Sequence, residues 1–152
     1  VTGGGWIMSP PGACKLASCS DSTVGKANFG FVSKYQKGAK TPTGQTEFQF
    51  KSGNLNFHST NYEVLVISGC KAQYRGTGTI NGVGVYEFTL TAYDAQFGNS
   101  GSCAGKSKDS FRIKIKNGGT VVYDNRMGSA DDVDGADPQE ISGGSIVIHN
   151  GK

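Results

Sequence analysis

Residues 109–125 read DSFRIKIKNGGTVVYDN and carry the clearest structural signal in the chain. Apolar and cationic residues alternate from Phe111 to Lys116, which is the period of a strand with one dry face and one wet face. The cationic members of this run are expected to face solvent. The NGG cluster that follows tolerates positive φ, and the β-branched and aromatic residues 120–123 form the returning strand. A single hairpin is not stable alone in water, so other strands must cover its apolar face.

Other stretches with strand-like patterns supply that cover. Asn81-Gly82 is the strongest short hairpin signal in the sequence and joins two of them. Residues 62–68 form an almost continuous apolar run, which predicts a strand in mid-sheet that is buried on both faces. Residues 1–9 form an edge strand or a segment that pairs with something else. The further strands are predicted at residues 26–36, 45–51, 55–57, 71–80, 83–95 and 143–150.

These strands predict the fold class. Turn signals recur about every 8–12 residues, and no helical period of useful length appears. We therefore predict a single all-β domain spanning residues 1–152, built as an antiparallel two-sheet β-sandwich, with a jelly roll as one form of it.

The composition restricts the class of protein. The chain has 152 residues, enough for one domain with a real core, and its 24 glycines suit a fold with many tight turns. An apolar fraction of 36% and an aromatic fraction of 10% argue against both a disordered chain and a membrane span. The net charge of +3 is mild and dispersed, so the sequence lacks the clustered charge that nucleic-acid binding usually needs.

The four cysteines indicate disulfides. The spacing of Cys14, Cys19, Cys70 and Cys103 does not match the paired short spacings of zinc sites. Three pairings can be drawn, and we favour Cys14–Cys19 with Cys70–Cys103. The chain starts at Val1 without a signal peptide, as a processed, exported protein would, so we expect a secreted, extracellular or cell-surface location.

Several ordered segments, spread over nearly the whole chain, point to a family. They are VTGGGWI (residues 1–7), GKANFGFVSKYQKGA (25–39), PTGQTEFQFKSGNLNFHSTNYE (42–63), KAQYRGTGTING (71–82), DSFRIKIK (109–116), VVYDN (121–125) and GGSIVIH (143–149). Together they resemble the post-COAP domain of secreted, often multi-domain bacterial surface proteins. The resemblance implies an exported all-β domain. It implies no activity and no catalytic residues, and its pattern is silent about the disulfides.

The acidic run DVDGAD, residues 132–137, is the sharpest local motif. Spaced carboxylates around a glycine turn can wrap a hard cation, so Asp132, Asp134 and Asp137 are the predicted ligands of a calcium ion. The match to an EF-hand loop is incomplete, because Ala136 stands where a ligand would be and no flanking helices are predicted. The alternative is a solvated acidic loop that holds no metal.

The sequence contains no recognised catalytic constellation. Its two histidines, His58 and His149, belong to neither a G-x-S-x-G nor an H-E-x-x-H motif. The glutamates are scattered and single out no pair for glycoside hydrolysis. We therefore expect a protein that is not an enzyme, with a secreted hydrolase as an alternative.

Aromatic side chains offer another alternative, a stacking platform for sugars. With the acidic loop, such a platform would define a calcium-dependent carbohydrate-binding module that takes polysaccharide as its partner. Strand aromatics more often pack in the core or form ladders along a sheet face. The residues concerned are Trp6, Tyr35, Tyr62, Tyr74, Tyr86, Tyr93 and Tyr123.

The function we predict is a non-catalytic extracellular structural or adhesive role. Residues 1–9 are rich in glycine, and such a segment frays unless something holds it. It lies along its own sheet, or it fills an open edge in a neighbouring copy with Trp6 and Ile7 as anchors. Exchange of this strand from copy to copy would build a filament.

Overall fold

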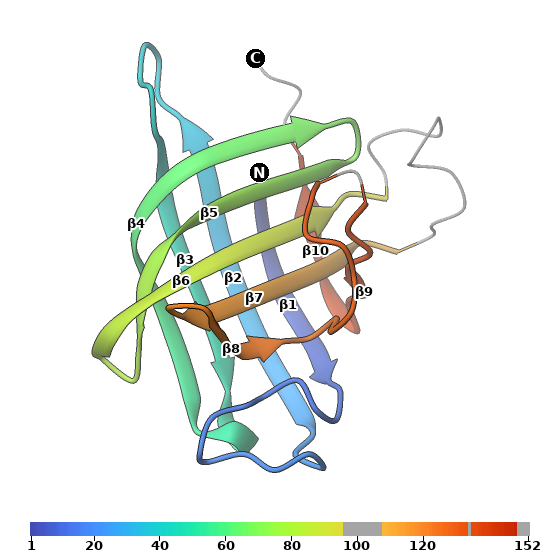
Figure 1. Cartoon of the computed structure of the whole chain (residues 1–152). Coiled ribbons are helices and arrows are strands. Elements are labelled where there is room, and N and C mark those ends of the chain that lie inside the picture. The colour runs from blue at the N-terminus through green and yellow to red at the C-terminus, as the bar shows by residue number, and fades with distance from the viewer. Residues whose placement is uncertain (96–107, 134, 149–152) are drawn as a thin grey trace.

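The computed structural model describes residues 1–95, 108–133 and 135–148 (Figure 1). Every strand pair is antiparallel, and the only helical element among these residues is a short 3-10 turn, η1 (Lys51–Gly53). The all-β prediction is therefore confirmed. The strands are β1 (Thr2–Ser9), β2 (Gly25–Tyr35), β3 (Pro42–Phe50), β4 (Leu55–Ser68), β5 (Lys71–Ile80), β6 (Val83–Tyr93), β7 (Ser110–Asn117), β8 (Thr120–Asp124), β9 (Gln139–Glu140) and β10 (Gly143–Val147).

The strands follow chain order from β1 to β8, and β10 is added beside β1. They form one continuous hydrogen-bonded path, so the two-sheet and jelly-roll details of the prediction are not confirmed. In Figure 1 the path bends over on itself, with β1, β2, β3 and β10 behind and β5 to β8 in front. The long strand β4 runs from the rear layer to the front one. Register shifts between Ser59 and Asn61 and between Tyr62 and Val64 mark this bend.

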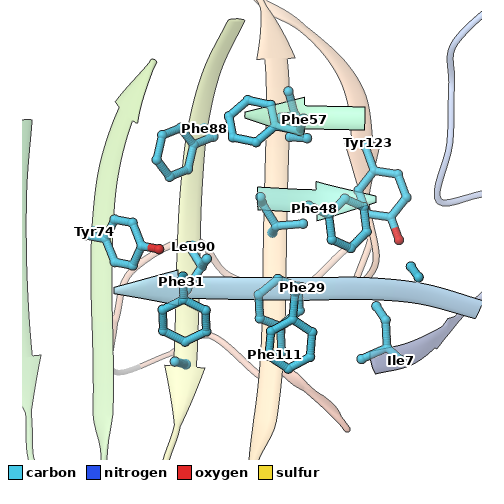
Figure 2. Packing of buried hydrophobic residues seen from close by; sticks show 14 of the residues in the cluster. Ile7, Phe29, Phe31, Phe48, Phe57, Tyr74, Phe88, Leu90, Phe111 and Tyr123 are labelled. Atoms are coloured by element: carbon cyan, nitrogen blue, oxygen red, sulfur yellow. The ribbon is translucent and has the colours of Figure 1, made fainter. Parts of the chain in front are cut away.

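The core lies between the two layers and is largely aromatic (Figure 2). Phe29 of β2 stacks on Phe111 of β7 with ring centroids 4.1 Å apart, and Phe48 of β3 packs on Tyr123 of β8 at 4.8 Å. These pairs join the rear layer to the front one. The inward-facing residues predicted from the alternation of residues 109–125 are buried, as are those of β2 and β3.

The segment from β9 to β10 closes the gap between the two ends of the sheet. β9 pairs with the start of β7, and the Ser142 amide donates to the Trp6 carbonyl at 2.9 Å. The Gln139 side chain also donates to the carbonyl oxygen of Met8 in β1, at 2.8 Å. The sequence predicted only loop before residue 143, because a two-residue strand has no readable period.

At this closure, side chains form hydrogen bonds with backbone groups that have no neighbouring strand to pair with. Asn125 accepts from the Ile113 amide and donates to the Phe111 carbonyl, both at 2.9 Å, where β8 has left β7. Asp109 and Asp94 accept from the amides of Ile146 and Ile148, at 2.7 and 2.9 Å. Both aspartates are buried, and they bind β10 and the residue that follows it.

Strand β1 is internal, between β2 and β10, and is not an edge strand. It forms there because small residues on both strands let two backbones approach closely. A Cβ on Gly144, whose φ is +100°, would lie 2.0 Å from the carbonyl oxygen of Gly4. A Cβ on Gly3 would meet the ring of Phe31 at 2.7 Å.

The prediction that residues 62–68 are buried on both faces is wrong. Tyr62 and Leu65 are buried, but the consecutive residues Val66 and Ile67, which point to opposite faces of the strand, are 44% and 43% exposed. After the hairpin the sequence allows either Val85 or Tyr86 as a core residue, and the structure has Tyr86 packed against the core and Val85 76% exposed. The hairpin itself is confirmed, since Asn81 and Gly82 have positive φ of 54° and 78°.

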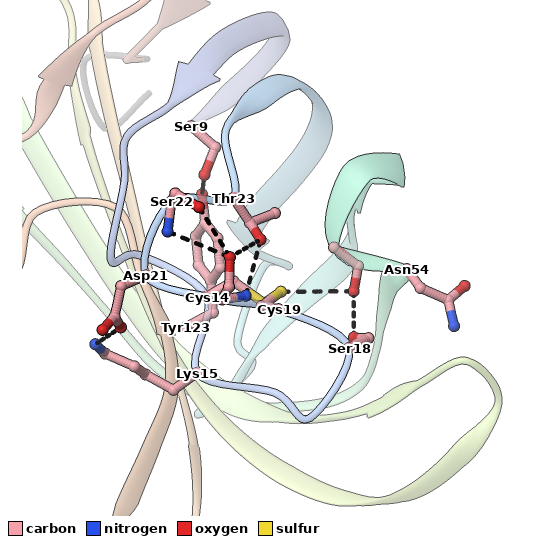
Figure 3. The surroundings of a disulfide bond; sticks show 12 residues. Ser9, Cys14, Lys15, Ser18, Cys19, Asp21, Ser22, Thr23, Asn54 and Tyr123 are labelled. Atoms are coloured by element: carbon pink, nitrogen blue, oxygen red, sulfur yellow. Dashed lines mark hydrogen bonds and ion pairs between the residues drawn. A yellow bond between two sulfur atoms is a disulfide. The ribbon is translucent and has the colours of Figure 1, made fainter.

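The predicted Cys14–Cys19 disulfide is present (Figure 3). The connection that it closes covers the free edge of β8, because Lys15 donates its amide to the Val122 carbonyl and the Asp124 amide donates to the Ala13 carbonyl. Cys70 is disulfide-bonded as well. Its predicted partner, Cys103, lies outside the described residues.

Candidate functional site

The outer face of β4 to β7 forms the candidate site. Outward side chains of these strands meet a loop, described at residues 126–133 and 135–138, that folds back over one end of β5, β6 and β7. This loop contains most of the acidic run that the sequence singled out. The site is therefore a sheet face with a wall along one side.

Arg112 fastens this wall, although the alternation of β7 predicted that it faces solvent. Its side chain is only 3% exposed and forms a bidentate pair with Asp124, through Nε at 3.0 Å and Nη2 at 2.7 Å. Its Nη1 also donates to the Ala130 carbonyl at 2.7 Å. Burial by itself lowers the pKa of Arg112, but the hydrogen bond and charge of Asp124, aided by Asp131, raise it above its ordinary value. The charge is fully satisfied within the protein.

Two neighbouring side chains also hold the loop by its backbone. The buried Lys71 donates to the Ala136 carbonyl at 2.8 Å, and Gln73 donates to the Asp131 carbonyl. Lys114 adds an ion pair with the Asp131 carboxylate at 2.9 Å. The hydrogen bond from Lys114 is the main cause that lowers the pKa of Asp131. These contacts come from β5 and β7, so the wall is tied to two strands.

Beyond the wall the face is hollowed into an open groove of about 470 Å³. Thr89 of β6 lies at its floor, flanked in the sheet by Arg75 of β5 and Lys114 of β7. A short side chain between two long ones produces the depression. The other side chains that shape it include Glu63, Gln73, Glu87, Lys116, Asp131 and Asp132.

The charged groups on the open side of the groove are not paired with one another. Within the described parts of the chain, Glu63, Arg75, Glu87 and Lys116 make no side-chain hydrogen bond or ion pair. Their donors and acceptors are thus available to a ligand, in contrast to the satisfied charges under the loop.

Two of the three predicted calcium ligands lie among the described residues, and both have partners within the protein. Asp132 accepts from the amide of Gly135 at 2.9 Å, and Asp137 forms an ion pair with Arg126. Asp134 lies outside the described residues. In the ranges that the structure covers, no three His, Cys, Asp or Glu side chains gather closely enough to hold a metal ion. Calcium binding stays a prediction.

The histidines and aromatic residues are divided between surface and core. His58 pairs with Glu47 at 3.0 Å on the exposed face of β3 and β4, and His149 lies outside the described residues. Trp6, Tyr35 and Tyr86 keep accessible surface on separate strands. The remaining members of the predicted sugar platform are core residues, namely Tyr62, Tyr74, Tyr93 and Tyr123.

The two predicted self-association residues have different surroundings. Ile7 is fully buried in the core of its own chain. Trp6 is half-buried on the outer face, where the Nζ atom of Lys26 lies 4.7 Å from the ring centroid. Trp6 also lies against Gly143, where a Cβ would fall 2.3 Å from the indole nitrogen.

Sequence reasoning missed the groove. Its side chains come from four strands and one loop, and no local pattern links them. The alternation of residues 111–116 in β7 did predict which of its side chains point outward. The pairing register that sets Arg75, Thr89 and Lys114 in one row has no sequence signal of its own.

Comparison of the chain with protein-family models, with curated proteins and with solved structures finds no match. The post-COAP resemblance therefore stays a prediction. The described part of the chain has no helix long and apolar enough to cross a membrane.

Proposed function

We propose that the protein is a non-catalytic extracellular module with a structural or adhesive role. The observation that supports this most directly is the use of its buried acids. Asp94 and Asp109 bind backbone amides of the last strand, and Asp124 neutralises Arg112. Groups that perform chemistry must face a substrate, whereas these fasten strands and a loop. The Cys14–Cys19 disulfide fits an oxidising compartment.

Assembly by exchange of β1 is the structural role that we propose. Strand β1 is hydrogen-bonded on both sides, so its removal would open a slot between β2 and β10. The β1 of another copy would fill that slot with the same register and the same anchor, Ile7. Such exchange preserves the native contacts of β1 and changes only those of the hinge that follows it.

The hinge for this exchange is short. Ala13 is held to β8 through its carbonyl, while β1 ends at Ser9, so only Pro10, Pro11 and Gly12 lie between. Proline fixes φ in the extended range, and short strained hinge loops favour domain swapping. Gly12 has a φ of +82°, which the closed turn requires and an open hinge does not.

Paired cysteines test the exchange directly. Gly4 and Ser145 face each other across β1 and β10, so the Gly4→Cys/Ser145→Cys variant should form disulfides between copies if β1 is exchanged. A covalent ladder on a non-reducing gel is the expected result. Gln49→Cys/Asn56→Cys is the matched control, because β3 and β4 form one hairpin and cannot separate in this way.

Light scattering and electron microscopy complete the test. The full chain is expected to assemble, and deletion of residues 1–9 should abolish assembly. The exchange is excluded if the full chain stays monomeric at high concentration and the Gly4→Cys/Ser145→Cys variant links only within one chain.

A further inference from the structure

We propose that the groove on β4 to β7 binds an acidic saccharide, in which isolated carboxylates are separated by neutral hydroxylated sugars. This site is distinct from β1 and its exchange. The inference rests on the charges that line the groove and on which of them are already paired.

Arg75 is the recognition residue for the carboxylate. Its guanidinium is exposed and has no side-chain partner among the residues described, whereas the neighbouring Lys114 is occupied by Asp131. A guanidinium presents a planar fork that matches a carboxylate with two parallel hydrogen bonds. The Thr89 floor next to it leaves room for the sugar ring that carries the acid.

The acidic side chains of the groove select against densely charged polymers. Three cationic residues line it against four carboxylates, two of which are Glu63 and Glu87 on the open side. A polyanion such as a nucleic acid would meet these acids at every step and be repelled. A sugar hydroxyl can instead donate to Glu63, Glu87 or Asp132.

Neutral sugars that depend on stacking are also a poor match. The one aromatic residue lining the groove is Phe88, which is buried and offers no ring face to a ligand. Hydrogen bonds and charge must therefore supply the affinity. A carboxylate gives the strongest of these, because charge-assisted hydrogen bonds are roughly twice as strong as neutral ones.

The wall of the groove is already in place before a ligand arrives. Arg112, Lys71 and Gln73 hold the loop through its carbonyls, and Lys114 holds Asp131. A site that needs no ordering on binding loses less conformational entropy. A rigid groove also fixes the spacing between Arg75 and the hydroxyl acceptors.

Calorimetry with a pair of matched polysaccharides tests the proposal. Glucuronoxylan carries single carboxylates along a neutral chain, and its carboxyl-reduced form differs only in lacking them. We expect binding to glucuronoxylan and a loss of roughly tenfold or more in affinity for the reduced form. Arg75→Gln should show the same loss and no further response to reduction. Lys34→Gln, which removes one exposed charge from β2, should bind like the native chain.

Four results would overturn the proposal. They are equal affinity for the two xylans, no binding to either, Arg75→Gln binding as well as Lys34→Gln, or heparin binding more tightly than glucuronoxylan. A glycine-rich peptide with spaced glutamates that binds as tightly as glucuronoxylan would assign the groove to peptides instead. The folded state of each variant is checked by its thermal unfolding.

Discussion

Two parts of the outer surface have the same sequence pattern and opposite surroundings. On β2 and β3 most of the outward residues, among them Asn28 and Gln49, are exposed. On β6 and β7 the outward residues Thr91 and Arg112 are buried, because residues 126–138 fold over them. Alternation therefore tells which way a side chain points but not whether solvent is there. A loop that folds back can turn a surface position into an interior one.

The largest expected effect comes from removing the arginine under the loop. Arg112→Met leaves the Asp124 carboxylate buried without its partner, which should cost about 3–5 kcal/mol of unfolding free energy in urea denaturation. Lys34→Ala, a cation on the uncovered face, should change it by less than about 0.5 kcal/mol.

The double variant Arg112→Met/Asp124→Leu separates the effect of an unpaired buried charge from the effect of the loop that covers the site. It should recover most of the lost stability, because an apolar pair of similar volume replaces the buried ion pair. If Arg112→Met proves as mild as Lys34→Ala, residues 126–138 do not cover this position in solution.

Asn125→Ala should have the next largest effect. The change leaves the Ile113 amide and the Phe111 carbonyl without partners inside the protein, at a cost of about 1–3 kcal/mol. Asn28→Ala on the uncovered face is the control and should be nearly neutral. Equal effects of the two asparagine variants in urea denaturation would contradict the role given to Asn125.

Calcium bound at the predicted site would stabilise the loop over β7 and not the uncovered face of β2 and β3. If Asp132, Asp134 and Asp137 bind it, the ion stabilises the folded state by about 1.4 kcal/mol at ten times its dissociation constant. Asp137 must first leave Arg126, which weakens binding. We expect millimolar calcium to raise the melting temperature relative to chelator and Asp132→Asn to remove the rise. An unchanged melting temperature in the native chain would reject the site.

The smallest expected effect is the change in unfolding free energy at acidic pH. Lys114 and Arg112 lower the folded-state pKa of Asp131 below its ordinary value of 3.8, so its contribution to stability is present above that pH. That contribution is lost as the pH falls through the lower, folded-state pKa. Because Asp131 is largely exposed, the loss should stay below about 0.5 kcal/mol. In acid titrations of urea stability, Asp131→Asn should flatten this part of the profile, and an unaltered profile would contradict the pairing.

The inner half of the fold could be predicted because its signal is local. Phe29, Phe48 and Ile113 belong to regular alternations of apolar and polar residues, and the Asn81-Gly82 dipeptide is enough to predict its hairpin. The sequence predicted two sheets and no strand order. The sequential order from β1 to β8 and the return of β9 and β10 to β7 and β1 are therefore findings of the structure.

The outer half was not predictable for a physical reason. The burial of Arg112 depends on Ala130 and Asp124, and the groove depends on the register of four strands. These contacts join residues that are not linked by any periodic pattern in the sequence, so a pattern of apolar and polar residues cannot predict them. The exposure of Val66 and Ile67 is another case, because an apolar run favours burial but does not show whether other parts of the chain cover it.

The loop over β7 is held largely by its peptide groups, and the Asp131 carboxylate adds side-chain contacts to Lys114 and Arg112. Arg112, Lys71 and Gln73 donate to the carbonyls of Ala130, Ala136 and Asp131, and every amino acid carries such a carbonyl. The sequence of this segment can therefore diversify while its attachment persists, as a CDR loop does on its framework. The rim of the groove is a place where new ligand preferences can evolve, or be selected from a library, without loss of the fold.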